Sequence, residues 1–118
     1  RSVALGQSAL AAQNFTTATD SHNTAVGHAA GGAVTTGVEN TLIGALAGDA
    51  LTDADKNVAV GYRSLTGDTL GSKSVAIGLG TLEAQNFTTA TDTFNSWCFS
   101  RRSSYNRCKK CPFRWCSR

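Results

Sequence analysis

The sequence lacks several residue types that mark common protein classes. Among 118 residues there is no Met and a single Pro, and residues 1–95 contain neither Cys nor Trp. No apolar run approaches the 18 or more residues of a membrane-spanning helix, so we expect no membrane contact within this segment. No secretory signal peptide is recognisable, and because the chain starts at an arginine we expect a fragment of a longer protein.

Charge and composition change abruptly near Asn95. Residues 1–95 carry four basic and eight acidic side chains, a net charge of −4, and all 12 glycines. Residues 96–118 carry seven cations, no acid, both Trp, the only Pro and all four Cys. Two unlike compositions are joined here, so we predict a domain over residues 1–95 and a separate tail over residues 96–118.

The first part is built from repeats. Five short segments, SVALG, NTAVG, NTLIG, NVAVG and SVAIG, each end in a glycine, and the glycines are spaced by 21, 17, 17 and 17 residues. The anchor positions are Gly6, Gly27, Gly44, Gly61 and Gly78. A longer period of 72 residues lies above these, because AQNFTTATD at residues 12–20 recurs at residues 84–92. Self-similarity at a fixed period predicts a repeat architecture with one structural unit per period.

Each unit has the alternation of a short strand. Bulky and mostly β-branched residues stand three positions and one position before the glycine, and a small residue, usually Ala, stands between them. We therefore predict a parallel β-helix of stacked coils whose core is made by the stacked Val and Ile residues. The Ala column has two interpretations: a contact with another chain, or packing inside its own coil. The glycine closes each unit where a Cβ would obstruct the turn.

The five units resemble the head repeats of trimeric autotransporter adhesins, the YadA-like heads. The match is carried by Ser74-Val75-Ala76-Ile77-Gly78 and its variants NTAVG and NVAVG, and it covers residues 2 to about 95. Similar repeats occur in bacteriophage tail fibres. The resemblance implies a left-handed parallel β-roll that forms an intertwined homotrimer on a cell surface or a virion tail. Those heads commonly have shorter coils, and the longer turns here fit the fibre variant at least as well.

The longer coils contain the best candidates for ligand contact. Their four extra residues fall in the AQNFTTATD segment, which we expect to bulge as a polar loop carrying Phe15 or Phe87. An aromatic side chain on a threonine-rich loop can contact a glycan or a host-surface protein. In the alternative and favoured interpretation each Phe folds back over the edge of its coil, since isolated apolar residues are common at surfaces.

No enzyme site stands out from the repeat in residues 1–95. Asp53, Asp55 and Asn57 match the start of a calcium loop, but the glycine and glutamate that such a loop needs are absent, so turn carboxylates are favoured. His22 and His28 have no metal-ligand spacing with Cys. There is no nucleophile elbow, P-loop or paired-carboxylate pattern. We predict a non-enzymatic protein without a cofactor.

The composition of the tail has three conventional interpretations. Cys98, Cys108, Cys111 and Cys116 lie among the seven cations and five aromatic residues. One CxxC pair can bind zinc, cations with aromatics can bind nucleic acid, and the four thiols can form a secreted disulfide framework. The second CxxC of a zinc site is missing, however. The zinc or nucleic-acid module is therefore the alternative function of a different class.

We favour a fourth explanation, in which the tail is an out-of-frame translation of the next coils. The 72-residue period predicts another NTAVG unit from Asn95, yet the chain continues SWCFSRRSS. When the codons are read one base out of register from Trp97, Trp-Cys must encode Gly, and most later positions can encode the residues of 27–48. The Cys residues then have no evolved role, and we expect no nucleic-acid partner. The whole pattern predicts a structural and adhesive fibre segment.

Overall fold

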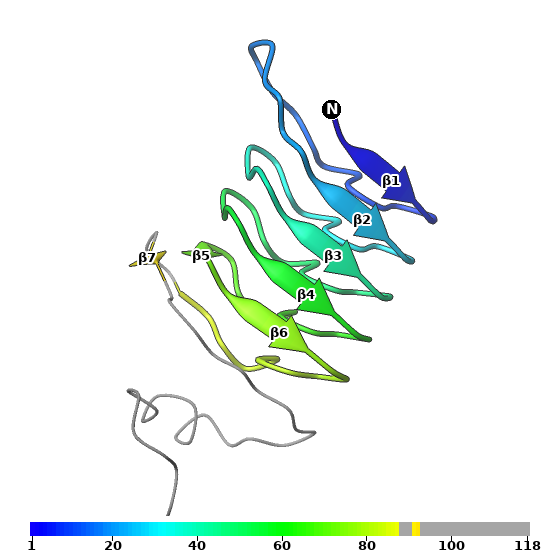
Figure 1. Cartoon of the computed structure of the whole chain (residues 1–118), viewed down its shortest axis with the longest axis vertical. Coiled ribbons are helices and arrows are strands. Elements are labelled where there is room, and N and C mark those ends of the chain that lie inside the picture. The colour runs from blue at the N-terminus through cyan, green and yellow to red at the C-terminus, as the bar shows by residue number, and fades with distance from the viewer. Residues whose placement is uncertain (88–90, 93–118) are drawn as a thin grey trace, which may run out of the picture.

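The fold is a stack of parallel strands joined by turns. The computed structural model describes residues 1–87 and 91–92, and within them it contains strands and turns but no helix. One sheet has the order β1-β2-β3-β4-β6 and the other pairs β5 with β7 (Figure 1). The strands are β1 (Val3–Leu5), β2 (Thr24–Val26), β3 (Thr41–Ile43), β4 (Val58–Val60), β5 (Gly71–Ser72), β6 (Val75–Ile77) and β7 (Thr91–Asp92). The predicted all-β fold of stacked parallel coils is confirmed.

The register follows the sequence repeat. Val3 pairs with Thr24, Thr24 with Thr41, and the same column continues through Val58 and Val75. We call the chain from one anchor glycine to the next a coil, and equivalent positions in successive coils a column. The backbone amides bond from coil to coil along the stack, as in the 2.8 Å bond from the Gly27 N–H to the Leu5 carbonyl. The register therefore comes directly from the glycine spacing.

The anchor glycines allow the coils to approach closely, as predicted. At Gly27 the backbone has φ +134°, an angle that residues with a Cβ rarely adopt. A Cβ built there would lie 2.6 Å from the carbonyl carbon of Gly44 in the next coil. A side chain at this position would thus push the two coils apart.

The corners of the coils use left-handed backbone at residues that are not glycine. Eleven non-glycine residues among those described have positive φ, between 50° and 61°. They fall into three columns: Ser8, Ala29, Leu46 and Arg63; Leu10, Leu65 and Leu82; and His22, Glu39, Lys56 and Lys73. Such residues cost more in this conformation than Gly or Asn would. The coil-to-coil hydrogen bonds hold them there.

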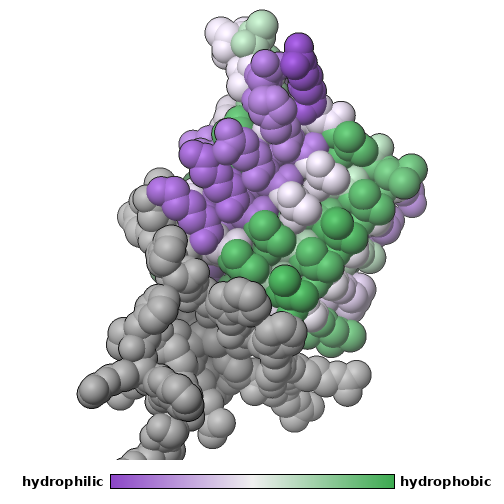
Figure 2. Space-filling model, viewed as in Figure 1, coloured by the Kyte–Doolittle hydropathy of each residue, from purple (hydrophilic) through white to green (hydrophobic). Residues whose placement is uncertain are grey.

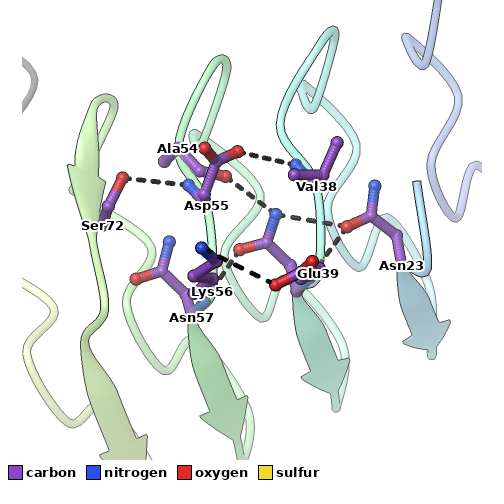
Figure 3. Close-up of polar contacts among 9 residues, drawn as sticks. Asn23, Val38, Glu39, Ala54, Asp55, Lys56, Asn57 and Ser72 are labelled. Atoms are coloured by element: carbon purple, nitrogen blue, oxygen red, sulfur yellow. Dashed lines mark hydrogen bonds and ion pairs between the residues drawn. The ribbon is translucent and has the colours of Figure 1, made fainter. Parts of the chain in front are cut away.

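A ladder of buried asparagines runs along one inner edge of the stack (Figure 3). The Asn40 N–H donates to Asn23 Oδ1 at 2.9 Å, and the Asn57 N–H donates to Asn40 Oδ1 at 3.0 Å. The Asn40 side-chain amide donates to the Ala54 carbonyl at 2.8 Å. Asn23, Asn40 and Asn57 are all buried, and the ladder ends where the Ser74 N–H donates to Asn57 Oδ1 at 2.8 Å. Each asparagine thus supplies hydrogen bonds that the turn backbone cannot make itself.

The predicted core was wrong about which side of the strands faces inward. The small column is buried, with Ala25, Leu42, Ala59 and Ala76 all at 0% exposure. The Val and Ile columns instead face outward, and Val3 and Ile43 are 58% and 40% exposed. The coil interior is narrow, and leucines from the turns, together with Leu42 from one strand, already fill it. The small column therefore packs inside its own coils and is not a contact with another chain.

Leu42 fills the interior of two neighbouring coils. Its methyl groups lie 2.6 Å and 2.8 Å from the positions that a Cβ would take at Gly31 and Gly48. In the three other coils, the position of these two glycines is occupied by leucine. The strand position of Leu42 is occupied by Ala in those coils. Those leucines are Leu10, Leu65 and Leu82. The core is thus filled from the strand in one place and from the turns in the others.

Replacing Leu42 by alanine should lower the free energy of unfolding by about 3 kcal/mol, because Leu42 is completely buried and neither Gly31 nor Gly48 has a side chain that could refill the cavity. Urea denaturation of the full chain measures this. The Leu79→Ala control removes the same atoms from a side chain that is 51% exposed, and it should cost under about 1 kcal/mol. Adding Gly48→Leu to Leu42→Ala copies the Ala59 and Leu65 pairing and should recover part of the loss. No recovery would contradict this account of the core.

Candidate functional site

One long side of the solenoid is apolar. We call it the outer face and define it by the ten outward side chains of strands β1, β2, β3, β4 and β6: Val3, Leu5, Thr24, Val26, Thr41, Ile43, Val58, Val60, Val75 and Ile77. Eight of the ten are Val, Leu or Ile and none is charged. Figure 2 shows a continuous apolar stripe beside a polar edge. Tyr62 and Leu79, 49% and 51% exposed, follow the anchor glycines of their coils.

A loop projects from one corner of the stack near the first strand (Figure 1). The Asn14 N–H donates to the Thr35 carbonyl at 3.0 Å, and the Ser21 carbonyl accepts a bond from the following coil. Between these two bonds the first coil has six residues, 15–20, where the following coil has only two, 36–37. The four extra residues of the longer coil are thus placed in a bulging loop, as predicted from the sequence.

The side chains of this loop are polar and accessible. Thr16, Thr17 and Thr19 are exposed, and the Thr19 hydroxyl donates to the Thr17 carbonyl at 3.2 Å. Arg1 Nε lies 3.5 Å from Asp20 Oδ1, with both side chains well exposed. An ion pair in such a position contributes little stability. The hydroxyls and the carboxylate remain accessible to a ligand from solvent.

The two candidate contact residues, Phe15 and Phe87, are both half-buried. A Cδ atom of Phe87 lies 2.8 Å from the position that a Cβ would take at Gly71, so the ring packs against this glycine. For Phe87 this is the folded-back arrangement that the sequence analysis favoured. A ligand contact by either ring stays a prediction, and the exposed threonines are the more accessible part of the first loop.

Asp68 fixes the start of the second AQNFTTATD segment, a role that sequence reasoning missed. It is completely buried. Its carboxylate accepts hydrogen bonds from the Gly71 N–H at 3.0 Å, the Phe87 N–H at 3.1 Å and the Gln85 side chain at 2.8 Å. The only signal in the sequence is that Asp68 stands in a column with Gln13, Val34, Leu51 and Gln85. Three donors satisfy a carboxylate that burial alone would disfavour.

The residues that start like a calcium loop are used within the stack. Asp55 Oδ1 accepts from the Val38 N–H at 2.8 Å (Figure 3), and Asp53 accepts from the Thr36 hydroxyl. Asn57 belongs to the buried ladder. The two aspartates therefore act as turn carboxylates that join neighbouring coils.

The two histidines lie at exposed positions. His22 has φ 51° at a corner, and His28 follows an anchor glycine. In the part of the chain that the structure describes, no group of three or more His, Cys, Asp or Glu residues is placed to hold a metal ion. The histidines are therefore surface residues of the turns.

The predictions for the tail lie outside the described residues. These are the boundary at residue 96, the weak zinc alternative at Cys98, Cys108, Cys111 and Cys116, and the out-of-frame translation. They stay predictions from sequence.

Comparison with protein-family models, with curated proteins and with solved structures found no match to this chain. Residues 1–87 and 91–92 include no helix long and apolar enough to span a membrane. The function is therefore inferred from the chemical character of the outer face and of the projecting loop.

Proposed function

We propose that this chain is a structural and adhesive segment of a surface fibre. It forms part of a rod that displays short loops to a host-surface protein or glycan, and it has no catalytic role. The rod is a left-handed β-roll and a homotrimer, as the resemblance to YadA-like heads implies, and it belongs to a bacterial cell surface or a virion tail.

The observation that carries this proposal is the regular coil stack with a loop that leaves it at one corner. Each coil bonds through its backbone to the next, so the stack extends in one dimension and is stiff along its axis. The ladder and the anchor glycines repeat the same contacts in successive coils. This construction suits a spacer or fibre.

The two identical segments AQNFTTATD are spaced for multivalent display. Asn14 and Asn86 are the third residues of the two identical segments, and both contact the same threonine column, at Thr35 and Thr69. They are four coils apart, which corresponds to about 19 Å at the spacing of parallel strands. Loops on one edge at a fixed distance can bind one extended ligand together, so weak single contacts add up to useful avidity.

Replacing residues 15–20 by Thr-Gly should lower binding by about tenfold or more, because it removes one of two linked contacts. This change gives the first coil the turn of the second coil, Thr36–Gly37, so the fold is retained. The measurement compares the binding of the full-length parent chain and of the variant to arrays of immobilised oligosaccharides and extracellular proteins. Circular dichroism checks the fold of each variant.

The matched control is the double variant Gln7→Ala and His28→Ala. Both side chains are exposed after anchor glycines, away from the loop. The control should bind like the parent chain. Equal binding by the loop variant and the parent would contradict an adhesive role for this loop, and equal losses in both variants would show an unspecific surface effect.

A further inference from the structure

The projecting loop begins with a triplet that the proposed function does not use. Asn14-Phe15-Thr16 has the sequence Asn-x-Thr with x other than proline, which is the acceptor pattern for N-linked sugars. Such a triplet occurs often by chance, so its position in the fold decides whether it can react. Here it lies where the chain leaves the stack of coils, at the base of a loop that projects from one corner (Figure 1). A second protein can therefore reach it.

The atoms that sugar transfer requires are accessible in this triplet. The side chains of Asn14 and Thr16 are both exposed, and neither makes a hydrogen bond to another residue within the range 1–87 and 91–92. The Asn14 backbone N–H donates to the Thr35 carbonyl at 3.0 Å, and Phe15 is half-buried. The backbone is thus held against the stack while the amide nitrogen and the hydroxyl stay open to solvent.

The second copy of the triplet has the same sequence in a different setting. Asn86 Oδ1 accepts a hydrogen bond from the Thr69 hydroxyl at 3.2 Å, and the Phe87 N–H donates to Asp68 Oδ1 at 3.1 Å. Thr88 lies outside the described residues. A transferase must draw the acceptor amide into its own site, so bonds that hold Asn86 and Phe87 on the stack oppose the reaction at the second copy.

We propose that Asn14, and much less Asn86, accepts an N-linked sugar from a diphosphate-activated donor. The inference goes beyond the proposed function, because it concerns a covalent change of the loop and not its ligand. Asn14 Nδ2 bonds to the anomeric carbon of the sugar, and the bond from that carbon to the donor's diphosphate breaks, so the diphosphate leaves with the electron pair. One amide proton passes to a carboxylate of the transferase, and nothing is oxidised or reduced. The Thr16 hydroxyl is the group by which the transferase recognises the triplet.

Sugar transfer to the folded full chain tests the proposal. One arm supplies a soluble N-glycosyltransferase with a uridine-diphosphate sugar, and the other supplies an oligosaccharyltransferase with a lipid-diphosphate oligosaccharide, so the arms distinguish the two sources of the sugar. Mass spectrometry of peptides locates it. In at least one arm Asn14 should react at least about tenfold faster than Asn86, because two hydrogen bonds at the second copy must break first. The free peptide AQNFTTATD gives the rate of the triplet without the fold, and it is the same for both copies.

Two variants separate recognition of the triplet from exposure of the loop. Thr16→Val removes the hydroxyl and keeps the shape of the side chain, so it should abolish transfer to Asn14. Thr17→Val makes the same change at the next exposed threonine, outside the triplet, and should leave transfer unchanged. A folded parent chain without sugar on Asn14 in both arms would overturn the proposal, as would equal transfer to the parent and to Thr16→Val. Equal rates at Asn14 and Asn86 would also overturn it, since the fold would then make no choice between the two copies.

Discussion

Replacing Asn40 by leucine should lower the free energy of unfolding by about 4 kcal/mol, because it leaves two buried backbone groups without partners. The Asn57 N–H loses Asn40 Oδ1, and the Ala54 carbonyl loses the Asn40 amide. Asn40 is completely buried, so water cannot replace these bonds without opening the coil. Urea denaturation of the full chain gives the measurement.

An exposed asparagine provides the control for this substitution. Asn14 has an exposed side chain, and its backbone N–H already bonds to Thr35. Asn14→Leu should therefore change the free energy of unfolding by under about 1 kcal/mol. A loss of similar size at both positions would show that the ladder has no special role.

The Asn40→Asp variant distinguishes lost hydrogen bonds from a general packing defect. Its carboxylate would keep the bond from the Asn57 N–H but would face the Ala54 carbonyl and Asn23 Oδ1. Burial and these oxygens favour the protonated form, so the pKa of the introduced carboxyl would rise on folding. A raised pKa in the folded state means that stability relative to the parent falls as pH increases above about 4. The variant should therefore be less destabilised at acid pH than at neutral pH.

The sequence repeat predicted strands β1, β2, β3, β4 and β6 and their register correctly, because the spacing of the anchor glycines determines both. It did not predict β5 and β7. It did not reveal which side of each strand faces inward. A two-residue alternation identifies two faces but not the interior one. The usual expectation that Val and Ile are buried failed, because the narrow coil interior is filled by the strand alanines together with leucines such as Leu10 and Leu65. Leu42, the one large residue in the small column, was the available signal.

The left-handed corners, the asparagine ladder and the role of Asp68 depend on contacts between coils, which cannot be predicted from the type of a single residue. The left-handed corners use Glu39 and Lys56 among others, residues without a preference for that conformation. Asn23, Asn40 and Asn57 are the first residues of three of the repeated segments, so their position is visible in the sequence, but the ladder depends on the way their coils stack. The projecting loop could be predicted because four additional residues must leave a coil of fixed size. The role of Asp68 could not be predicted, because the three groups that donate hydrogen bonds to its carboxylate come from two different coils.

Replacing Gly61 by alanine should be among the most damaging single changes, with a loss of about 4 kcal/mol or more. A Cβ at this position would lie 2.5 Å from the Gly78 carbonyl oxygen, which belongs to the backbone of the next coil and cannot rotate away. The backbone at Gly61 also has φ +132°, which strains any residue with a Cβ by about 1–3 kcal/mol. The two penalties act together, since relief of one requires the strands to separate.

Gly32→Ala is the matched control for this prediction. Gly32 is not among the glycines with positive φ, and a Cβ there would meet the Ala29 carbonyl oxygen at 3.2 Å. The same column carries side chains in other coils, at Ala11 and Thr66, so the change should cost under about 1 kcal/mol. Urea denaturation compares the two variants. Equal stability would contradict the close approach of the coils at the anchor glycines.

The position of the damage adds a second test. Coils contact only their neighbours, so a break between β4 and β6 should release the C-terminal coil first and leave β1, β2 and β3 paired. Hydrogen exchange should show early loss of protection at the Gly78 amide, which donates to the Val60 carbonyl at 2.7 Å. The Gly27 amide, at the other end of the stack, should retain its protection. Uniform loss along the chain would mean that the coils unfold as one unit, and the nearest-neighbour description of this rod would be wrong.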